Sequence, residues 1–161
     1  MNRKRILIIA LLTTLLILSV GVGFFLLKRA NEKGISNKDI STNIDRITIR
    51  IANTQRNYSG TSYTLELKNA SRYLIKQNSV YLSYPIIQGE SRQTNSCKVE
   101  ATGNKIDIKP NEEVTLHVFI PCEDYKDNNK IDSNQPQFEI EGYLNEINTL
   151  THFGKSGDLI K

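Results

Sequence analysis

Residues 114–120 read VTLHVFI and residues 63–68 read YTLELK, and in both stretches apolar and polar side chains alternate one by one. A period of two is typical of a β-strand that buries one face and exposes the other, because successive side chains of a strand point to opposite sides. Five further segments, rich in β-branched residues, have the same pattern. They are residues 47–51, 80–84, 97–101, 106–108 and 138–142.

Turn-forming sequences separate these segments, and no stretch after residue 45 keeps a helical period over three turns. About seven short antiparallel strands in one domain are typical of an immunoglobulin-like β-sandwich. The sequence therefore predicts an all-β fold with such a sandwich over residues 45–154, and a small antiparallel barrel is the alternative. Residues 155–161 are predicted to form a flexible tail.

A run of 22 residues without a charge lies near the N-terminus, where residues 6–27 read ILIIALLTTLLILSVGVGFFLL. As a helix this run spans about 33 Å, enough for a hydrocarbon core of about 30 Å. The sequence predicts one transmembrane helix over residues 6–27. The alternative is a cleaved secretory signal, whose apolar core of about 7–15 residues would precede a site of small residues.

The flanks of this run indicate its orientation. Residues 1–5 read MNRKR, a short basic tail that favours the cytoplasm. A long C-terminal region can cross the membrane despite basic residues beside the apolar run. We therefore predict a cell-membrane protein with a cytoplasmic N-terminus and an extracytoplasmic C-terminal domain. Residues 28–44 are polar and are predicted to be a linker, with a fraying helical extension near the membrane as an option.

The net positive charge of the chain comes from its N-terminal segment. The chain of 161 residues has a formal net charge of +4. Its first 29 residues hold five basic side chains and no acidic one, whereas the rest hold 16 basic and 17 acidic side chains. A nucleic-acid-binding domain needs a basic face on its folded part, so the charge distribution gives no support to a nucleic-acid partner.

The two cysteines of the chain, Cys97 and Cys122, flank predicted strands. If residues 97–101 pair antiparallel with residues 114–121, the two side chains fall nearly opposite each other. Outside the cytoplasm, a single pair of cysteines is typical of one disulfide. We therefore predict a disulfide that stabilises the domain by about 3 kcal/mol. Two separate thiols that pack as small apolar residues are the alternative.

Several residues resemble parts of known active sites without completing one. Residues 154–156 (GKS) lack the earlier glycine of a phosphate-binding loop. His117 and His152 accompany no nucleophile motif. Glu139 and Glu141 share one strand face and are expected to be a solvated surface rather than an acid–base pair. The sequence thus predicts neither a catalytic residue nor a cofactor.

One loop is rich in oxygen ligands, because residues 123–132 read EDYKDNNKID. Calcium binds such loops on some β-sandwiches through carboxylates and carbonyls. The ligand order of an EF-hand is absent, and two lysines oppose a cation. We expect a solvated loop and predict no metal site, with calcium binding as the alternative.

Tyrosines are numerous, with seven in the chain. Tyr81 lies opposite the apolar set of its strand, and Tyr73 is placed to do the same. Exposed tyrosines supply a large contact area at low entropic cost. The sequence predicts Tyr73 and Tyr81 as a binding surface, and the alternative is that such aromatic residues only support the sheet.

Three segments carry a resemblance to known proteins. Residues 65–71 (LELKNAS) and 80–85 (VYLSYP) have the pattern of a strand that ends in Leu-x-Asn and is followed by another strand. Residues 108–114 (IKPNEEV) have a Pro-x-Glu turn that leads into an alternating strand. Over residues 45–121 the chain resembles bacterial single-pass membrane-anchored proteins with an extracytoplasmic immunoglobulin-like domain. The resemblance implies binding or assembly at the cell surface and no catalytic residue.

From these patterns we expect a membrane-anchored, extracytoplasmic, non-catalytic interaction module. Its expected partners are the lipid bilayer, through residues 6–27, and another envelope protein or a wall polymer. The alternative is a hydrolase-like envelope enzyme, whose site would be assembled from residues that are distant in the sequence.

Overall fold

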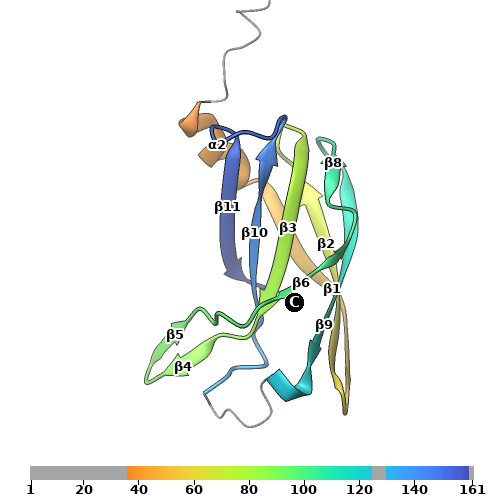
Figure 1. Cartoon of the computed structure of the whole chain (residues 1–161), viewed down its shortest axis with the longest axis vertical. Coiled ribbons are helices and arrows are strands. Elements are labelled where there is room, and N and C mark those ends of the chain that lie inside the picture. Colours follow the sequence, from red (N-terminus) through yellow and green to blue (C-terminus); the bar gives the residue numbers. More distant parts are fainter. Residues whose placement is uncertain (1–35, 125–129, 160–161) are drawn as a thin grey trace, which may run out of the picture. The chain divides into compact units, whose positions relative to one another are not determined.

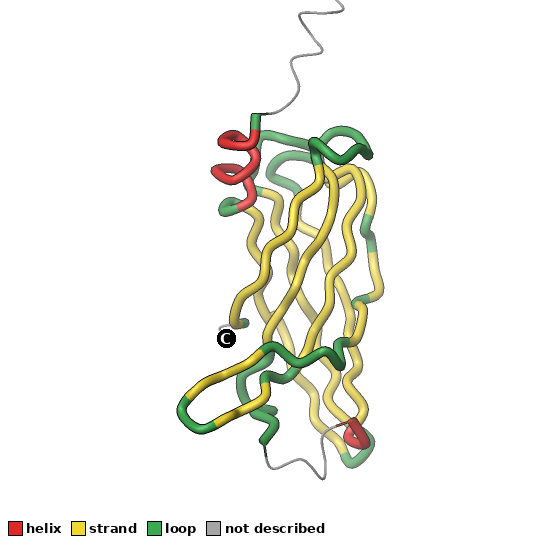
Figure 2. Tube along the Cα trace, turned by 60° about the vertical axis from the view of Figure 1, so that its left-hand side comes forward, coloured by secondary structure: helices red, strands yellow, loops and turns green. Residues whose placement is uncertain are grey.

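The computed structural model describes residues 36–124 and 130–159, which form antiparallel strands and one short α-helix. The longer strands build two sheets that face each other across one hydrophobic core (Figures 1 and 2). The predicted all-β fold is confirmed.

The first sheet has four strands in the order β1-β2-β9-β7. A tight turn joins β1 to β2, because Oδ1 of Asn57 accepts hydrogen bonds from the backbone N–H groups of Ser59 and Gly60 at 2.9 and 3.0 Å. Strand β2 pairs with β9 along most of its length. The bounds are β1 (Ile47–Asn57), β2 (Gly60–Asn69), β7 (Thr102–Gly103) and β9 (Glu113–Pro121).

The second sheet has the order β11-β10-β3-β6, and β8 also pairs with β3. A separate hairpin of β4 and β5 projects beyond the sheets (Figures 1 and 2). The bounds are β3 (Ile75–Ser83), β4 (Ile86–Gln88), β5 (Ser91–Gln93), β6 (Val99–Glu100), β8 (Ile106–Ile108), the 3-10 helix η1 (Cys122–Asp124), β10 (Gln137–Leu144) and β11 (His152–Asp158).

The alternation of apolar and polar residues in the sequence matches the buried and exposed faces of each sheet. In β9 the even-numbered residues 114–120 are buried and the odd-numbered residues 113–119 are exposed. The buried residues of β9 and β2 meet those of β3 and β10 in one core. Burial of each large apolar side chain contributes about 1.5–3 kcal/mol, so this contact holds the two sheets together. Fully buried examples are Leu65, Leu67, Ile75, Val80, Leu82, Leu116 and Ile140.

One predicted strand, residues 97–101, is divided between the sheets. Strand β6 pairs with Tyr81 and Leu82 of β3, whereas β7 pairs with β9 in the opposite sheet. Ala101, which lies between β6 and β7, is completely buried. Gly103 has a φ of +136°, and a Cβ atom there would lie 2.7 Å from a backbone oxygen of β9. The chain therefore crosses from one sheet to the other at this point.

The crossing explains why the predicted disulfide is wrong. Cys97 and Cys122 are free thiols that do not lie at disulfide distance. The prediction assumed that residues 97–101 pair with β9, but only residues 102–103 do so. Cys97 instead precedes β6 in the second sheet. Cys122 begins η1, where its N–H donates to the carbonyl of Ser59 at 2.8 Å.

The segment predicted as a linker, residues 28–44, contains a helix, α2 (Asn37–Ile44). Ser36 caps it, because the serine Oγ accepts a hydrogen bond from the N–H of Asp39 at 3.1 Å. Ile40 is buried against the core of the sheets, so the helix belongs to the folded domain. The linker prediction is corrected for residues 37–44.

The predicted flexible tail, residues 155–161, is also corrected, because residues 155–158 belong to β11 and pair with β10. Two glycines in β11 hide the alternation of this strand. Lys155 fixes its position, since Nζ donates to the carbonyl oxygens of Ile44, Asp45 and Ile47 at 3.4, 3.3 and 2.8 Å. These contacts join the last strand to the start of the first.

The predicted cytoplasmic tail, residues 1–5, and transmembrane helix, residues 6–27, lie outside the described residues. Within residues 36–124 and 130–159, no helix has the length and the apolar character that crossing a bilayer requires. The membrane anchor stays a prediction.

Candidate binding surface on the second sheet

The outer face of the second sheet gathers aromatic and charged side chains. Side chains alternate along β3 and β10, so residues 77, 79 and 81 share this face with residues 139, 141 and 143. The antiparallel register places Tyr81 opposite Glu139. We call the following set the Tyr81 surface: Tyr81, Lys98, Glu139, Glu141, Tyr143 and His152.

A cation–π contact restrains the ring of Tyr81, and an ion pair holds the cation of that contact in place. Lys98, just before β6, places Nζ 4.5 Å from the centroid of the Tyr81 ring, which is a cation–π contact. The same Nζ bonds Oε2 of Glu139 at 2.9 Å. The Lys98 and Glu139 side chains are 35% and 30% exposed, so their ion pair adds little to stability. Its main effect is to hold the ammonium group over the ring.

Both partners of this ion pair are kept in their charged forms. The hydrogen bond with Glu139 raises the pKa of Lys98, and the hydrogen bond from Lys98 lowers the pKa of Glu139, while desolvation opposes each shift. A general acid or base works best with a pKa near the pH of the reaction. The pair is therefore better suited to binding than to proton transfer.

A second aromatic pair lies nearer the other end of the surface. Tyr143 of β10 and His152 of β11 are opposite in register, and their rings meet edge to face with centroids 5.3 Å apart. Tyr143 is half-buried and His152 is exposed. The surface thus presents aromatic groups on both sides of Glu141.

Two hollows lie on this face, and Tyr81 lines both. The first, about 140 Å³, is also lined by Lys98, Gln137, Glu139 and Ser156. The second has a volume of about 120 Å³. It is lined by Tyr81 together with Gln77, Ser79, Glu141, Tyr143 and His152. Tyr81 is therefore shared by two small polar depressions.

Among the described residues that line the second hollow, Glu141 is the one carboxylate. It is exposed and lies opposite Gly154 of β11, which has no side chain to cover it. Among the described residues, no lysine, arginine or histidine lies within ion-pair distance of Glu141. Its carboxylate is available for a hydrogen-bond donor or a positive charge from outside.

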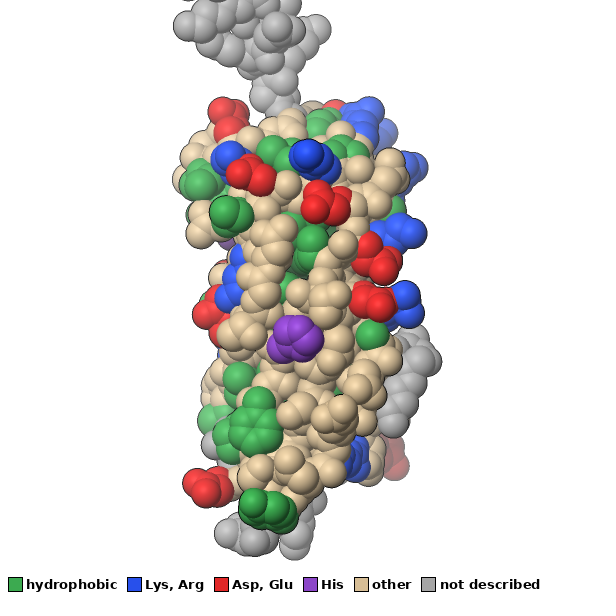
Figure 3. Space-filling model, turned by 90° about the vertical axis from the view of Figure 1, so that its right-hand side faces the viewer, with side chains coloured by type: hydrophobic (Ala, Val, Ile, Leu, Met, Phe, Trp, Pro, Cys, Tyr) green, Lys and Arg blue, Asp and Glu red, His purple; other side chains and the backbone are tan. Residues whose placement is uncertain are grey.

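The outer face of the first sheet has a different character (Figure 3). A broad hollow of about 490 Å³ is lined there mainly by uncharged residues such as Asn53, Thr64 and Thr102, together with His117 and Glu100. Figure 3 shows charged side chains gathered mainly in the upper part of this face. His117 points away from the core, as predicted. Among the described residues, this face has no comparable pair of fixed aromatic rings.

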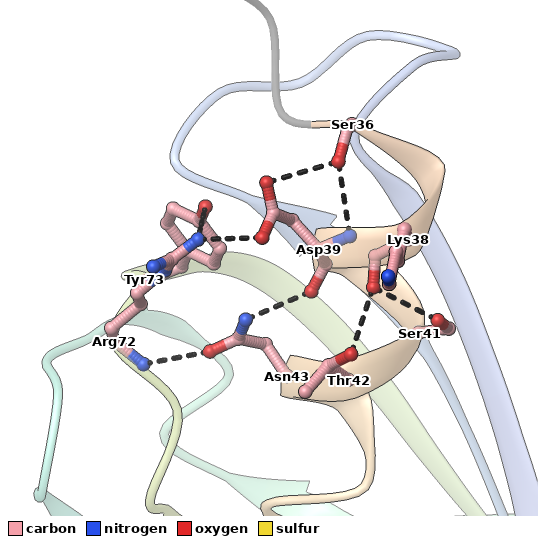
Figure 4. A network of polar contacts seen from close by, with 8 residues as sticks. All are labelled: Ser36, Lys38, Asp39, Ser41, Thr42, Asn43, Arg72 and Tyr73. Atoms are coloured by element: carbon pink, nitrogen blue, oxygen red, sulfur yellow. Dashed lines mark hydrogen bonds and ion pairs between the residues drawn. The ribbon is translucent and has the colours of Figure 1, made fainter.

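The structure does not bring the second predicted binding residue, Tyr73, to the Tyr81 surface. Tyr73 lies before β3, and its hydroxyl accepts a hydrogen bond from Nη2 of Arg72 at 2.9 Å (Figure 4). Arg72 also pairs with Asp39 of α2, and its backbone N–H donates to Asn43. These contacts make Tyr73 part of the junction between α2 and the sheets.

Only part of the loop that was considered for calcium binding belongs to the described residues. Of the loop 123–132, residues 125–129 lie outside the described residues. In the rest of the described chain, no group of three or more His, Cys, Asp or Glu side chains is placed to hold a metal ion. Asp132 is engaged instead in an ion pair with Arg92 at 3.0 Å.

Sequence reasoning placed Tyr81 on the surface but missed Lys98 and Tyr143. The alternation of residues 137–143 was the available signal for Tyr143, because it puts that residue on the same strand face as Glu139 and Glu141. Lys98 had no such signal, since its position depends on the crossing of the chain between the sheets.

Comparison with known proteins adds no assignment: no protein-family model matches this chain, and no curated protein is similar to it. The candidate surface therefore depends on the geometry of the described residues. Its features are a fixed phenol ring, two small hollows and an accessible carboxylate.

Proposed function

We propose that the chain is a single-pass membrane protein whose extracytoplasmic domain binds a partner, without catalysis, through the Tyr81 surface. In this proposal residues 6–27 cross the bilayer and the N-terminus is cytoplasmic. The observation that carries the binding role is the position of Tyr81, which lines two hollows and contacts Lys98 through its ring.

The immunoglobulin-like classification is part of the proposal, and the strand order supports it. Constant-type immunoglobulin domains place strands A, B, E and D in one sheet and C, F and G in the other. When the strands are lettered A to G along the chain, with β7 as D, the sheet order β1-β2-β9-β7 corresponds to A-B-E-D. The sheet order β3-β10-β11 corresponds to C-F-G. Strand β6 then extends the second sheet beside β3.

The physics of interfaces favours this face for binding. Tyrosines are enriched among the residues that dominate binding energy, and a side chain that is already fixed loses little entropy on binding. Tyr81 meets both conditions, because the cation–π contact with Lys98 restrains its ring. The charged state of Lys98 and Glu139 also fits recognition better than acid–base catalysis.

The charges on the surface indicate the chemistry of the partner. Glu139, Glu141 and Asp158 line the two hollows, and Lys98 is the only lysine or arginine among the described residues that line them. A partner that supplies hydrogen-bond donors or positive groups complements this arrangement. We propose another envelope protein, or a wall polymer that carries such groups.

The test is photo-crosslinking in intact membranes of the source cells, with the full chain and a photoreactive phenylalanine analogue, which keeps an aromatic ring, in place of Tyr81. We expect covalent adducts with a partner at this position. The matched control is the same residue in place of Tyr58, which is 98% exposed on the β1–β2 turn. We expect few or no adducts there.

A second pair of variants tests the energetic role of the ring. Tyr81→Ala is expected to abolish pull-down of the crosslinked partner, whereas Tyr58→Ala is expected to preserve it. Thermal unfolding of both variants controls for loss of the fold. If Tyr81→Ala stays folded and retains every partner, the Tyr81 surface is not the binding site.

A further inference from the structure

The loop between β10 and β11, residues 145–151, exposes two large apolar side chains. Ile147 is 57% exposed and Leu150 is 68% exposed. Single apolar residues are common on protein surfaces. Here, however, two aliphatic side chains lie three positions apart in one loop, whereas the other exposed large hydrophobic residues are dispersed over β8, β9 and the β1–β2 turn.

Internal hydrogen bonds hold this loop in shape. Oδ1 of Asn148 accepts from the N–H groups of Leu150 and Thr151 at 2.8 and 3.1 Å. The buried hydroxyl of Thr151 donates to the carbonyl of Glu146. Because polar groups inside the loop bond one another, the apolar side chains of Ile147 and Leu150 can be held outward.

The loop lies at the end of the domain where the described chain begins (Figures 1 and 2). The backbone N–H of Asn145 donates to the carbonyl of Leu74 at 2.8 Å, and the N–H of Leu74 donates to Oδ1 of Asn145 at 3.1 Å. The neighbouring Arg72 bonds α2 through Asn43 and Asp39. The exposed loop and the start of α2 thus share one end of the two sheets.

Only eight residues, 28–35, separate the apolar run from Ser36 at the cap of α2. Fully extended, eight residues reach at most about 28 Å, and as a flexible chain they average about 16 Å. The 11 residues of β1 alone extend about 36 Å. The tether is therefore shorter than the domain, and it leaves from the end that carries Ile147 and Leu150.

We propose that Ile147 and Leu150 insert into the lipid surface and dock this end of the domain on the membrane, an inference that rests on the proposed anchor. Amphipathic protein segments bury apolar side chains at the boundary between headgroups and acyl chains. Two side chains would hold a free protein only weakly. A short tether raises their effective concentration at the lipid surface and makes a weak contact sufficient.

The experiment uses the absence of tryptophan from the chain. The full chain with Ile147→Trp is reconstituted in vesicles of phosphatidylcholine and phosphatidylglycerol, with and without acyl-chain bromination. We expect blue-shifted emission, strong quenching by the brominated lipid and weak quenching by aqueous acrylamide. The control, Tyr58→Trp at the β1–β2 turn, is expected to show the opposite quenching pattern.

A second variant tests whether the aliphatic pair acts together. Leu150→Trp is expected to report insertion, and Leu150→Trp combined with Ile147→Asn is expected to lose the blue shift without a change in circular dichroism. Vesicle flotation separates the two proposals. A chain that floats but has a water-exposed Trp at position 147 overturns the docking alone. A chain that does not float overturns the anchor and the docking with it.

Discussion

Around Asn69 the polar groups of one side chain are saturated inside the protein, whereas on the Tyr81 surface polar groups face solvent. Asn69 is completely buried, and its Nδ2 donates to the carbonyls of Tyr73 and Ile108 at 2.8 and 3.0 Å. Its Oδ1 accepts from the N–H and the hydroxyl of Ser71 at 3.2 and 2.6 Å.

This difference in burial distinguishes polar groups that stabilise the domain from polar groups that can bind a ligand. Saturated buried groups are costly to disturb, because each group that loses its partner remains without water. Polar groups that are exposed and only partly bonded cost little to change, and they keep capacity for a ligand. Substitutions in the first region should therefore alter stability, and those in the second should alter binding.

The largest effect is expected from Asn69→Ala, which removes two donors and the acceptor of a buried network. We expect a loss of about 3 kcal/mol in the free energy of unfolding, measured by urea titration. Asn57→Ala is the matched control, because Asn57 forms the same Asn-x-Ser turn on the surface. We expect about 1 kcal/mol or less there. Equal losses would refute the contrast between buried and exposed networks.

A smaller effect is expected from Gly142→Ala on the inner side of β10. An added Cβ would lie 2.5 Å from the carbonyl oxygen of Gln77 and 2.9 Å from the Phe153 ring. Such overpacking costs about 2 kcal/mol. Gly154→Ala on the outer face of β11 is the control, since the nearest atom to its added Cβ is 4.0 Å away. In thermal unfolding, we expect a lower Tm for Gly142→Ala and an unchanged Tm for Gly154→Ala.

The smallest stability effect is expected from Glu139→Gln on the Tyr81 surface. The native pKa of Glu139 is lowered by Lys98, so the carboxylate stabilises the fold above its unfolded-state pKa. This contribution is lost as the pH falls through the native pKa. The variant should be slightly less stable than the parent near neutral pH, within the range of exposed ion pairs.

Urea midpoints of Glu139→Gln and its parent should converge as the solution is acidified. Glu90→Gln, between β4 and β5, is the control, because Glu90 is exposed and no ion pair of this carboxylate is found among the described residues. A difference between Glu139→Gln and the parent that persists at low pH would mean that the ion pair with Lys98 is not its cause.

The alternation of apolar and polar residues was enough to predict the long strands β1, β2, β3, β9 and β10 and the buried faces of these strands. Residues 114–120 show why: every second side chain is apolar, and those side chains form the core. The same reasoning placed Tyr81 on an outer face. Local patterns succeed here because a strand's two faces are decided by its own sequence.

Two of the predictions that failed depended on contacts between distant segments, and a third failed for a local reason. The pairing assumed for Cys97 and Cys122 required residues 97–101 to lie beside β9, and no local signal marks the crossing between the sheets. Tyr73 was expected on a binding surface, but α2 packs beside it. The strand at residues 152–158 was missed because its glycines weaken the apolar pattern.

The contact of Lys155 with the carbonyls of Ile44, Asp45 and Ile47 has a mechanical consequence. Any force transmitted through the N-terminal segment enters the domain at α2, next to these three acceptors. Because Lys155 belongs to β11, its contacts connect this part of the chain to β11, which is hydrogen-bonded along its length to β10. Pulling β1 away from its N-terminal end must therefore break the contacts of Lys155 as well as the pairing of β1 with β2.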